Sequence, residues 1–258
     1  MARLLQSRLA MRIFLASVGA IASLAVACTL HTSGTHHNGE FSYSNCFLGC
    51  ATTTPMMLGD EEDVSVSGAV PAVVSIESSS PSIVSIKSSA RECCSKDADA
   101  GTTCHTVALN DACASQETAT LRITVDAPAT GSSDLVIRQS DGTIWDSVSL
   151  TVEKAASLSL ACNTKTNASL NVNGSCPITW TAKDGAGKGL MSTRGIALTS
   201  SDANVVVFSG FLKTNQSTIQ ATPQLFGDVT LHAAGAGDAV VTGTGGGATE
   251  TLSVHVTP

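Results

Sequence analysis

The residues best suited to chemistry gather in a cysteine-rich segment, residues 91–113. It holds four cysteines and one histidine: Cys93, Cys94, Cys104, Cys113 and His105. Thiolates and imidazoles are the usual ligands of tetrahedral Zn²⁺, and the cysteines commonly stand two to four residues apart. This segment has no such pair, and two adjacent cysteines fit one ion poorly. Disulfides are therefore the favoured interpretation, and a ligand or metal site is the alternative.

The pairing of these cysteines stays open at the level of sequence. Cys46 and Cys50 bring the group to six, which allows 15 connectivities. Neighbouring cysteines seldom bond each other, so we expect Cys93 and Cys94 to bond two of the other four. Farther along, Cys162 and Cys176 flank a 13-residue stretch typical of a hairpin, and we expect them to bond each other.

Acidic residues and histidines offer weaker alternatives. Residues 60–63 are all acidic, and Asp97 and Asp99 stand just before Gly101, so both groups could supply oxygen ligands to Ca²⁺. The second group lacks the later carboxylate of a calcium loop, and the favoured interpretation of both is a solvated loop. Three histidines near the N-terminus could bind zinc, copper or nickel, but a solvated tether is favoured there: His31, His36 and His37.

Catalytic motifs are missing from the sequence. The glycine-rich residues 185–189 resemble a phosphate loop only superficially, because the upstream glycine is absent and Gly189 stands where Ser or Thr is needed. Neither a Gly-x-Ser-x-Gly elbow nor an HExxH motif occurs. His232 and His255 alternate with apolar neighbours and are expected on exposed strand faces. We therefore expect no enzyme activity, no cofactor and no dedicated metal site.

The N-terminus has the pattern of an export signal. Three arginines precede an apolar run over residues 13–27, which is too short for a membrane span and typical of a signal peptide. The run ends next to Cys28 and resembles a bacterial lipobox, in which that cysteine is lipidated. It departs from the lipobox pattern at Ala25, where leucine is preferred. The alternative is an ordinary secretory signal cut after Ala27.

Cysteine count and composition agree with an exported, anchored protein. The chain has nine cysteines, and setting Cys28 aside leaves eight, an even number suited to disulfides. No second apolar run approaches eighteen residues. The net charge of -7, without a basic block, argues against nucleic acid. We expect a membrane contact through lipid and protein or glycan partners at the bacterial outer membrane or cell surface.

Most of the remaining sequence alternates between apolar and polar residues, which predicts many short strands. Turn residues recur about every ten positions, and charged residues make up only 14% of the chain. The fold class expected is all-β, with two tandem Ig-like sandwiches. The expected organisation is a signal peptide over 1–27, a flexible tether over 28–50, a first domain over 51–153 and a second over 154–258.

Two consecutive ten-residue blocks stand out, PAVVSIESSS and PSIVSIKSSA at residues 71–90, identical at six positions. The duplication does not continue on either side, so it is not a repeat array. Its alternation predicts two successive strands of the first domain. If these strands lay side by side, Glu77 and Lys87 would approach each other.

Two stretches resemble a known family. SSSPSIVSIKS with ETATLRITVDAPATGSSDLVIRQ is similar to bacterial Ig-like repeats, and residues 178–208 are similar to the invasin and intimin type. The shared motifs consist of turn and core residues, so they imply a fold rather than a site. The cysteine-rich insertion departs from the family pattern. The resemblance implies a non-enzymatic structural spacer or adhesion module; the alternative is a surface protein that binds a ligand or metal through the insertion or the histidine-containing tether.

Overall fold

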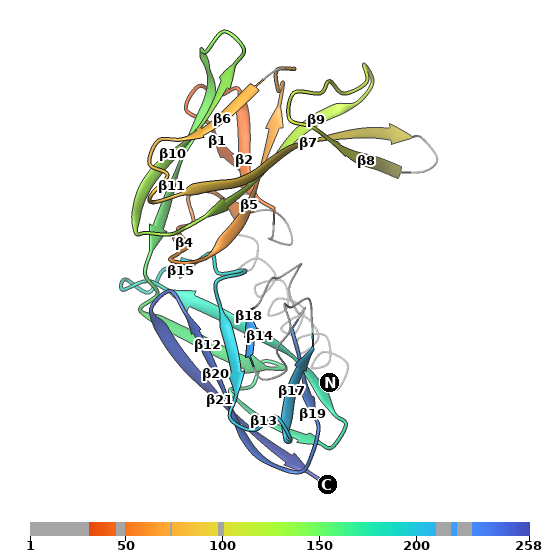
Figure 1. Ribbon diagram of the computed structural model, residues 1–258, viewed down its shortest axis with the longest axis vertical. Coiled ribbons are helices and arrows are strands. Elements are labelled where there is room, and N and C mark those ends of the chain that lie inside the picture. Colours follow the sequence, from red (N-terminus) through yellow and green to blue (C-terminus); the bar gives the residue numbers. More distant parts are fainter. Residues whose placement is uncertain (1–30, 45–49, 73, 98–100, 210–217, 221–228) are drawn as a thin grey trace, which may run out of the picture.

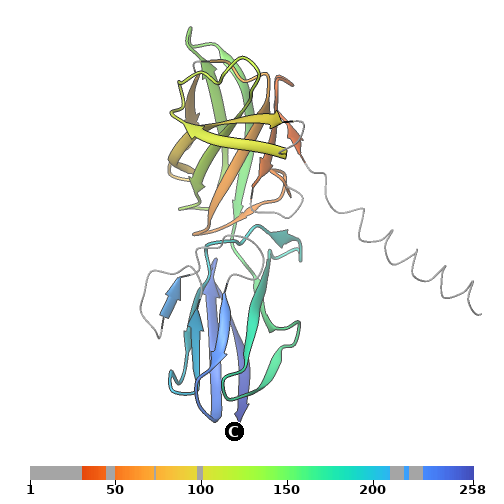
Figure 2. The same ribbon diagram turned by 90° about the vertical axis from the view of Figure 1, so that its right-hand side faces the viewer.

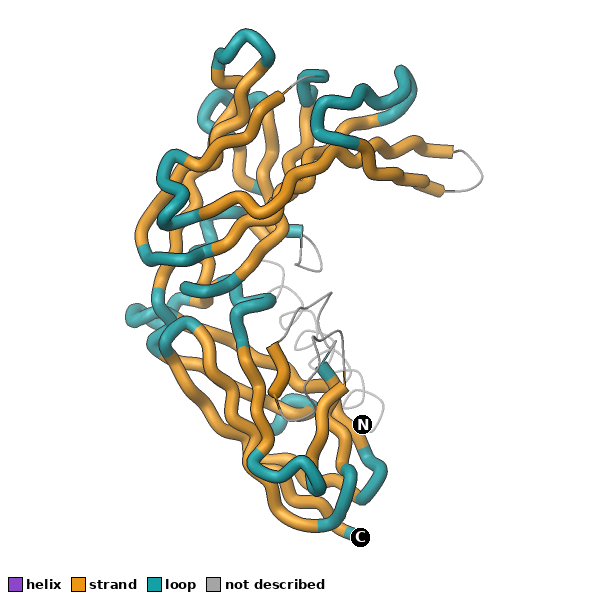
Figure 3. Tube along the Cα trace, in the orientation of Figure 1, coloured by secondary structure: helices purple, strands orange, loops and turns teal. Residues whose placement is uncertain are grey.

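The computed structural model describes residues 31–44, 50–72, 74–97, 101–209, 218–220 and 229–258. Over these residues the fold is all-β: two tandem Ig-like sandwiches are stacked end to end (Figures 1 and 2). Figure 3 shows strands and loops only. Across the described ranges no helix has the length and apolar character needed to cross a membrane.

The first sandwich has two facing sheets. Its larger sheet runs β1-β2-β5-β9-β7-β8, with β3 added beside β2. These strands are β1 Thr32–Ser33, β2 Gly39–Tyr43, β3 Cys50–Ala51, β5 Glu61–Gly68, β7 Ser85–Asp97, β8 Gly101–Val107 and β9 Thr118–Asp126. The smaller sheet runs β4-β11-β10-β6. Its strands are β4 Met56–Met57, β6 Val74–Ser78, β10 Gly131–Gln139 and β11 Ile144–Glu153.

The second sandwich follows at once, since β11 ends at Glu153 and β12 begins at Ser157. One sheet runs β12-β14-β19-β17 with β15 beside β14; the other runs β13-β21-β20-β16-β18. The strands of the first sheet are β12 Ser157–Cys162, β14 Ser175–Lys183, β15 Gly189–Leu190, β17 Val206–Ser209 and β19 Thr230–Ala233. Those of the second are β13 Asn167–Asn171, β16 Ala197–Ser200, β18 Thr218–Gln220, β20 Gly237–Gly245 and β21 Ala248–Thr257.

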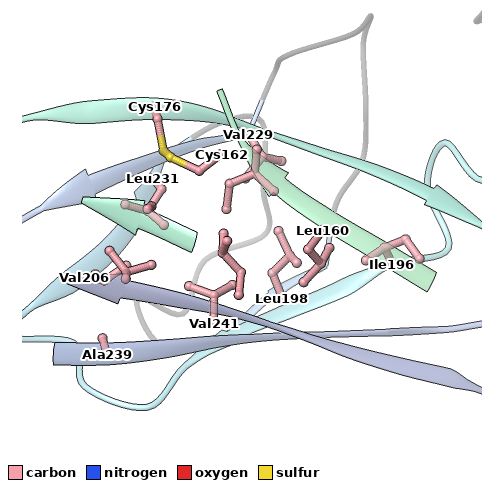
Figure 4. Close-up of a cluster of buried hydrophobic side chains, with 14 of the residues drawn as sticks. Leu160, Cys162, Cys176, Ile196, Leu198, Val206, Val229, Leu231, Ala239 and Val241 are labelled. Atoms are coloured by element: carbon pink, nitrogen blue, oxygen red, sulfur yellow. A yellow bond between two sulfur atoms is a disulfide. The ribbon is translucent and has the colours of Figure 1, made fainter. Parts of the chain in front are cut away.

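The two-residue period of the sequence accounts for the two cores. Alternate side chains of a strand point to opposite faces, so one set packs between the sheets and the other meets water. In β5, Val64 and Val66 are buried, and in β21 Leu252, Val254 and Val256 are buried. Figure 4 shows the second core, where leucines, valines and the Cys162–Cys176 disulfide meet between the sheets.

Residues 31–44 are not a tether, which corrects the sequence-based expectation. They form the hairpin β1–β2, and β2 pairs with β5 along its length. Phe41 and Tyr43 are fully buried in the first core. The sequence GEFSY does alternate, but a single five-residue strand in a polar surrounding is a weak signal.

One buried carboxylate fixes this hairpin to the opposite sheet. Asp146 of β11 is fully buried and accepts hydrogen bonds from four backbone N–H groups, those of His36, Asn38, Gly39 and Ser147, at 2.9, 2.9, 2.6 and 2.8 Å. Burial by itself would raise the pKa of Asp146, but the four N–H groups outweigh it and hold the pKa below its ordinary value.

The duplicated blocks form two successive strands, as predicted, but not neighbours in one sheet. Val74 and Ile76 lie in β6 of the smaller sheet, whereas the second block leads into β7 of the larger sheet. Glu77 therefore pairs with Arg138 at 3.0 Å, and Lys87 pairs with Glu61 at 2.6 Å. The two blocks face each other across the sandwich rather than side by side.

Candidate functional site: an interdomain joint and a braced arm

The two sandwiches are joined by backbone hydrogen bonds as well as by the linker. Met57 of β4 donates its N–H to the carbonyl of Met191, and Met191 donates in turn to the carbonyl of Pro55, both at 2.8 Å. A parallel bridge therefore joins Met56 to Met191 across the boundary. A segment of the second sandwich therefore lies beside β4 of the first and is hydrogen-bonded to it.

Side chains are exchanged across the same boundary. Met57 belongs to the first sandwich in sequence, yet its side chain is fully buried in the second core. Met191 comes from the second sandwich and packs in the first core, beside Met56. Gly246 makes room for Met57, because a Cβ at Gly246 would lie 2.5 Å from Cγ of Met57. The core of each sandwich thus contains one methionine side chain that comes from the other sandwich.

Two buried carboxyls reinforce the joint. Asp60 and Glu62 are both fully buried at the start of β5. Asp60 accepts the backbone N–H groups of Thr193 at 3.0 Å and Arg194 at 2.6 Å. Glu62 accepts the hydroxyl of Thr193 at 2.5 Å and its N–H at 3.2 Å. Both side chains of the first sandwich therefore bind the same short segment of the second.

The remaining two acidic residues form the outer half of the joint. Glu61 and Asp63 point to the other face of β5, where the guanidinium of Arg194 lies 2.9 Å from Glu61 and 2.6 Å from Asp63. The side chain of Arg194 is only 15% exposed, so solvent screens these pairs less than it would screen open surface pairs. The solvated loop expected for residues 60–63 is therefore wrong: they begin a strand and connect the two domains.

The electrostatics of the joint favour the protonated form of Asp60. Burial, followed by the nearby charge of Glu62 and a hydrogen bond to it, raises the pKa of Asp60 well above its ordinary value. The N–H groups of Arg194 and Thr193 act in the opposite direction but do not outweigh these causes. Burial and the same two carboxyls also raise the pKa of Tyr43, so its phenol stays neutral.

Replacing Asp60 by asparagine is expected to make the stability of the chain less dependent on pH. Because the pKa of Asp60 is raised on folding, the folded chain keeps a proton that the unfolded chain releases above pH 3.8. This stabilisation is complete below that pH and is lost as the pH rises towards the raised pKa. Urea titrations from about pH 4 to 8 measure the effect. Equal pH slopes in the two proteins would contradict the raised pKa of Asp60.

The second notable feature is an arm formed by β7 and β8. β7 is the longest strand described, with thirteen residues, and its outer half pairs with β8 from Arg91–Val107 to Asp97–Gly101. In Figures 1 and 3 this hairpin extends away from both sandwiches. The side chains of Thr102, Thr103, Cys104, His105 and Thr106 are all exposed.

Two disulfides brace the arm. Cys94 bonds Cys104 directly across the hairpin, and Cys93 bonds Cys113 in the loop that follows β8. Both bonds agree with the sequence-based expectation, and the Cys162–Cys176 bond does too. Each disulfide closes a loop of ten to twenty residues, and in the chain-entropy account such a bond stabilises the folded form by roughly 3 kcal/mol. Of the remaining cysteines, Cys28 and Cys46 lie outside the described residues, and only the backbone of Cys50 is described.

A buried arginine anchors the base of the arm. Arg91 is 2% exposed, and it donates to the carbonyl of Leu109 at 3.0 Å and to those of Pro71 and Ala72 at 2.7 and 3.0 Å. Burial lowers the pKa of its guanidinium. One side chain thus joins the loop after β8 to the start of the duplicated blocks, and nothing in the sequence pattern around Arg91 signals this role.

The candidate metal ligands come together in part. Cys93, His105 and Glu117 are close to one another, and so are Glu92, Cys94 and Cys104. In both groups the sulfurs are already bonded in disulfides, which offer no thiolate to an ion. His36 and His37 lie in the turn between β1 and β2, where His37 contacts Ser33 at 3.0 Å, and His31 is exposed. The side chain of Asp97 is not described, and Asp99 lies outside the described residues.

Removing the cross-strand disulfide is expected to loosen the arm without unfolding the sandwich. In a Cys94→Ser/Cys104→Ser double variant, the backbone amides of β8 should exchange with solvent at least tenfold faster, because local opening becomes easier by up to roughly 3 kcal/mol. Amides of β5 and β9 should keep their protection. Hydrogen exchange followed by mass spectrometry makes the measurement, and unchanged exchange over β8 would show that the disulfide does not hold the arm.

Comparisons with known proteins find only distant similarity. No family model matches the chain, and no curated protein does. Solved structures similar to it include the adhesin FdeC of Escherichia coli, at 14% identity over 90% of this chain and 67% of that chain, with a TM-score of 0.32. The adhesin InvE of Yersinia pseudotuberculosis matches at 11% identity over 88% and 60%, with a TM-score of 0.32. Domains 4 and 5 of the S-layer protein SbsC match at 17% identity over 52% and 69%, with a TM-score of 0.29. At these identities and TM-scores the similarities indicate no shared function, and the description of the fold rests on the strands and sheets of this chain.

Proposed function

We propose that the chain is a non-enzymatic module of the bacterial cell envelope, anchored by a lipid on Cys28. In this proposal the two sandwiches form a rigid spacer, and the arm is a contact surface for proteins or glycans. The joint between the two sandwiches carries the proposal. Met57 packs in the second core and Met191 in the first, and Asp60 and Glu62 both accept hydrogen bonds from the short segment that contains Thr193.

The construction of the joint favours a spacer over two independently moving domains. Domain interfaces that permit motion are small and polar, whereas interfaces with shared apolar cores hold one arrangement. Opening this joint would expose Met57 and Met191 and would leave Asp60 and Glu62 without their donors. Each of these changes costs free energy, so a single arrangement is expected to dominate.

Export is supported by the disulfides and by the N-terminal pattern. Structural disulfides persist in oxidising compartments and are rare in the cytosol. The chain has three of them among its described residues. The apolar run before Cys28 provides the signal, and the lipid would keep the protein at the membrane. Mass spectrometry of the mature N-terminus tests this part: we expect an acylated Cys28, and a free N-terminal amine would contradict anchoring.

Crosslinking on intact cells tests the role of the arm. The comparison uses the wild-type chain, the Cys94→Ser/Cys104→Ser variant, and a matched control that removes the disulfide of the second core, Cys162→Ser/Cys176→Ser. If the arm is the contact surface, crosslinked partners should be recovered with the wild type and the control and lost from the arm variant. Recovery of the same partners with the arm variant would place the contact elsewhere.

A further inference from the structure

The arm ends its sheet with an open edge. β8 is the last strand of the larger sheet of the first sandwich, and within the described residues it pairs with β7 alone. It is the longest edge strand among the described residues, with seven residues, whereas β12 has six and β6 and β13 have five. An edge of this length presents a row of backbone donors and acceptors to which another strand can bind.

This edge lacks the usual protection against such pairing. Natural edge strands are commonly blocked by lysine, proline, bulges or extreme shortness. β8 has the sequence GTTCHTV, without proline or a charged lysine, arginine, aspartate or glutamate. Its register with β7 has no bulge. The arm also extends away from both sandwiches in Figures 1 and 3, and no other described strand pairs with the outer edge of β8.

The cross-strand disulfide shows which backbone groups face outward. The Cα atoms of Cys94 and Cys104 are 4.1 Å apart. Directly opposed residues are about 4.5 Å apart in the pairs of an antiparallel ladder that exchange no hydrogen bonds, and about 5.5 Å apart in the pairs that do. The N–H and C=O of Cys104 therefore point away from β7. The alternation of a strand directs the same groups of Thr102 and Thr106 outward too.

We propose that two copies of this chain associate through β8, antiparallel, about a twofold axis at Cys104. In this register Cys104 faces Cys104 of the second copy, and Thr102 faces Thr106. The three outward residues of each copy would exchange about six hydrogen bonds in total. The inference rests on the proposed function only in taking the arm as a contact surface.

Charge and symmetry favour a second copy over an unrelated strand. About a twofold axis at Cys104, each residue of β8 meets the residue equally far on the other side of the axis, and no lysine, arginine, aspartate or glutamate is among the facing residues. The axis at Cys104 sets His105 opposite Thr103 and pairs threonine with threonine, a favourable cross-strand combination. The charged neighbours Glu92 and Arg122 pair with each other at 2.8 Å on inner strands. The two disulfides restrict the motion of the arm before association, and this lowers the entropic cost of forming the dimer.

Sedimentation equilibrium of the oxidised full chain, in a density-matched detergent, tests the proposal. The key variant is Thr106→Pro, which removes one outward N–H and leaves the β7 ladder intact. The matched control is Thr106→Ala, which removes the same side chain and keeps the N–H. We expect a concentration-dependent dimer for the wild type and the control, and a dissociation constant raised by about tenfold or more for Thr106→Pro.

Three results would overturn the proposal. One is a wild-type monomer at all concentrations in which Thr106→Pro has no effect on crosslinking to other proteins, and another is equal association of Thr106→Pro and Thr106→Ala. The third is a monomer in which Thr106→Pro abolishes crosslinking to a different protein, since that would assign the edge to another strand. A Thr102→Pro variant, which removes a second outward N–H, should repeat the effect of Thr106→Pro if folding is preserved. Any of these three results would leave the rigid spacer untouched, because the joint is remote from β8.

Discussion

Replacing Asp146 by alanine is expected to lower the free energy of unfolding of the first sandwich by about 4 kcal/mol. The reason is that four backbone N–H groups converge on this fully buried carboxylate, and alanine leaves them without an acceptor. Gly34 also lies against the carboxylate, so closely that a Cβ there would clash with it. The hairpin β1–β2 should detach first, which hydrogen exchange over residues 31–44 would report.

A nearby aspartate supplies the control. Asp141 also accepts hydrogen bonds from its own turn, through the N–H and hydroxyl of Thr143, but it is exposed. Asp141→Ala should change stability little. If the two variants were equally stable, the buried carboxylate would not be what holds the hairpin.

Acid should have the same effect as the alanine variant, more gradually. The pKa of Asp146 is lowered on folding, so its contribution is fully present above the ordinary aspartate pKa and is lost as the pH falls towards the lowered value. The contribution of Asp60 to stability depends on pH in the opposite direction, because its pKa is raised on folding and the contribution is therefore greatest in acid. The first sandwich and the joint should therefore weaken at opposite ends of the pH scale.

Replacing Met57 by alanine is expected to destabilise the second sandwich, although the residue belongs to the first in sequence. Met57 is fully buried in the second core, and truncating such a side chain costs about 2–5 kcal/mol. The chain has two tryptophans, Trp145 in the first core and Trp180 against the second, so tryptophan-resolved unfolding separates the domains. The transition reported by Trp180 should shift to lower denaturant.

Met56 is the matched control, because it precedes Met57 and is equally buried, but in the first core. Met56→Ala should shift the transition reported by Trp145 instead. Equal effects of both variants on the first sandwich alone would contradict the exchange of side chains. A single shared transition that both variants lower would mean that the joint makes the two sandwiches unfold together.

The strands and the two sandwiches could be predicted because they depend on a local pattern. Alternation in TATLRITVDA, DSVSLTVE and ETLSVHV marks β9, β11 and β21 directly, and the turn at residues 140–142 joins β10 to β11. The number of cysteines predicted disulfides, and the spacing of Cys162 and Cys176 predicted their bond, but the partners of Cys93 and Cys94 stayed open among four cysteines. These signals lie within a few residues of one another, so the sequence alone suffices to identify them.

The joint could not be predicted, because its parts are more than a hundred residues apart. A run of four acidic residues is usually solvated, and nothing beside Asp60 shows that Thr193 and Arg194 supply its donors. The alternation over residues 60–66 was present, with Glu62 in phase with Val64 and Val66, and it could have placed Glu62 inside. Asp146 is hidden in the same way, since an aspartate after a tryptophan carries no local sign that a distant hairpin surrounds it.

The central claim is that the two sandwiches behave as one rigid body. Residual dipolar couplings of backbone N–H bonds, measured on the full chain at near-neutral pH, test this most directly because they report the orientation of each domain. Fitted separately, β2, β5, β9 and β11 of the first sandwich and β14, β20 and β21 of the second should give one alignment tensor of the same magnitude and orientation. Two tensors of different magnitude would mean that the domains move independently, and they would contradict the proposal of a rigid spacer.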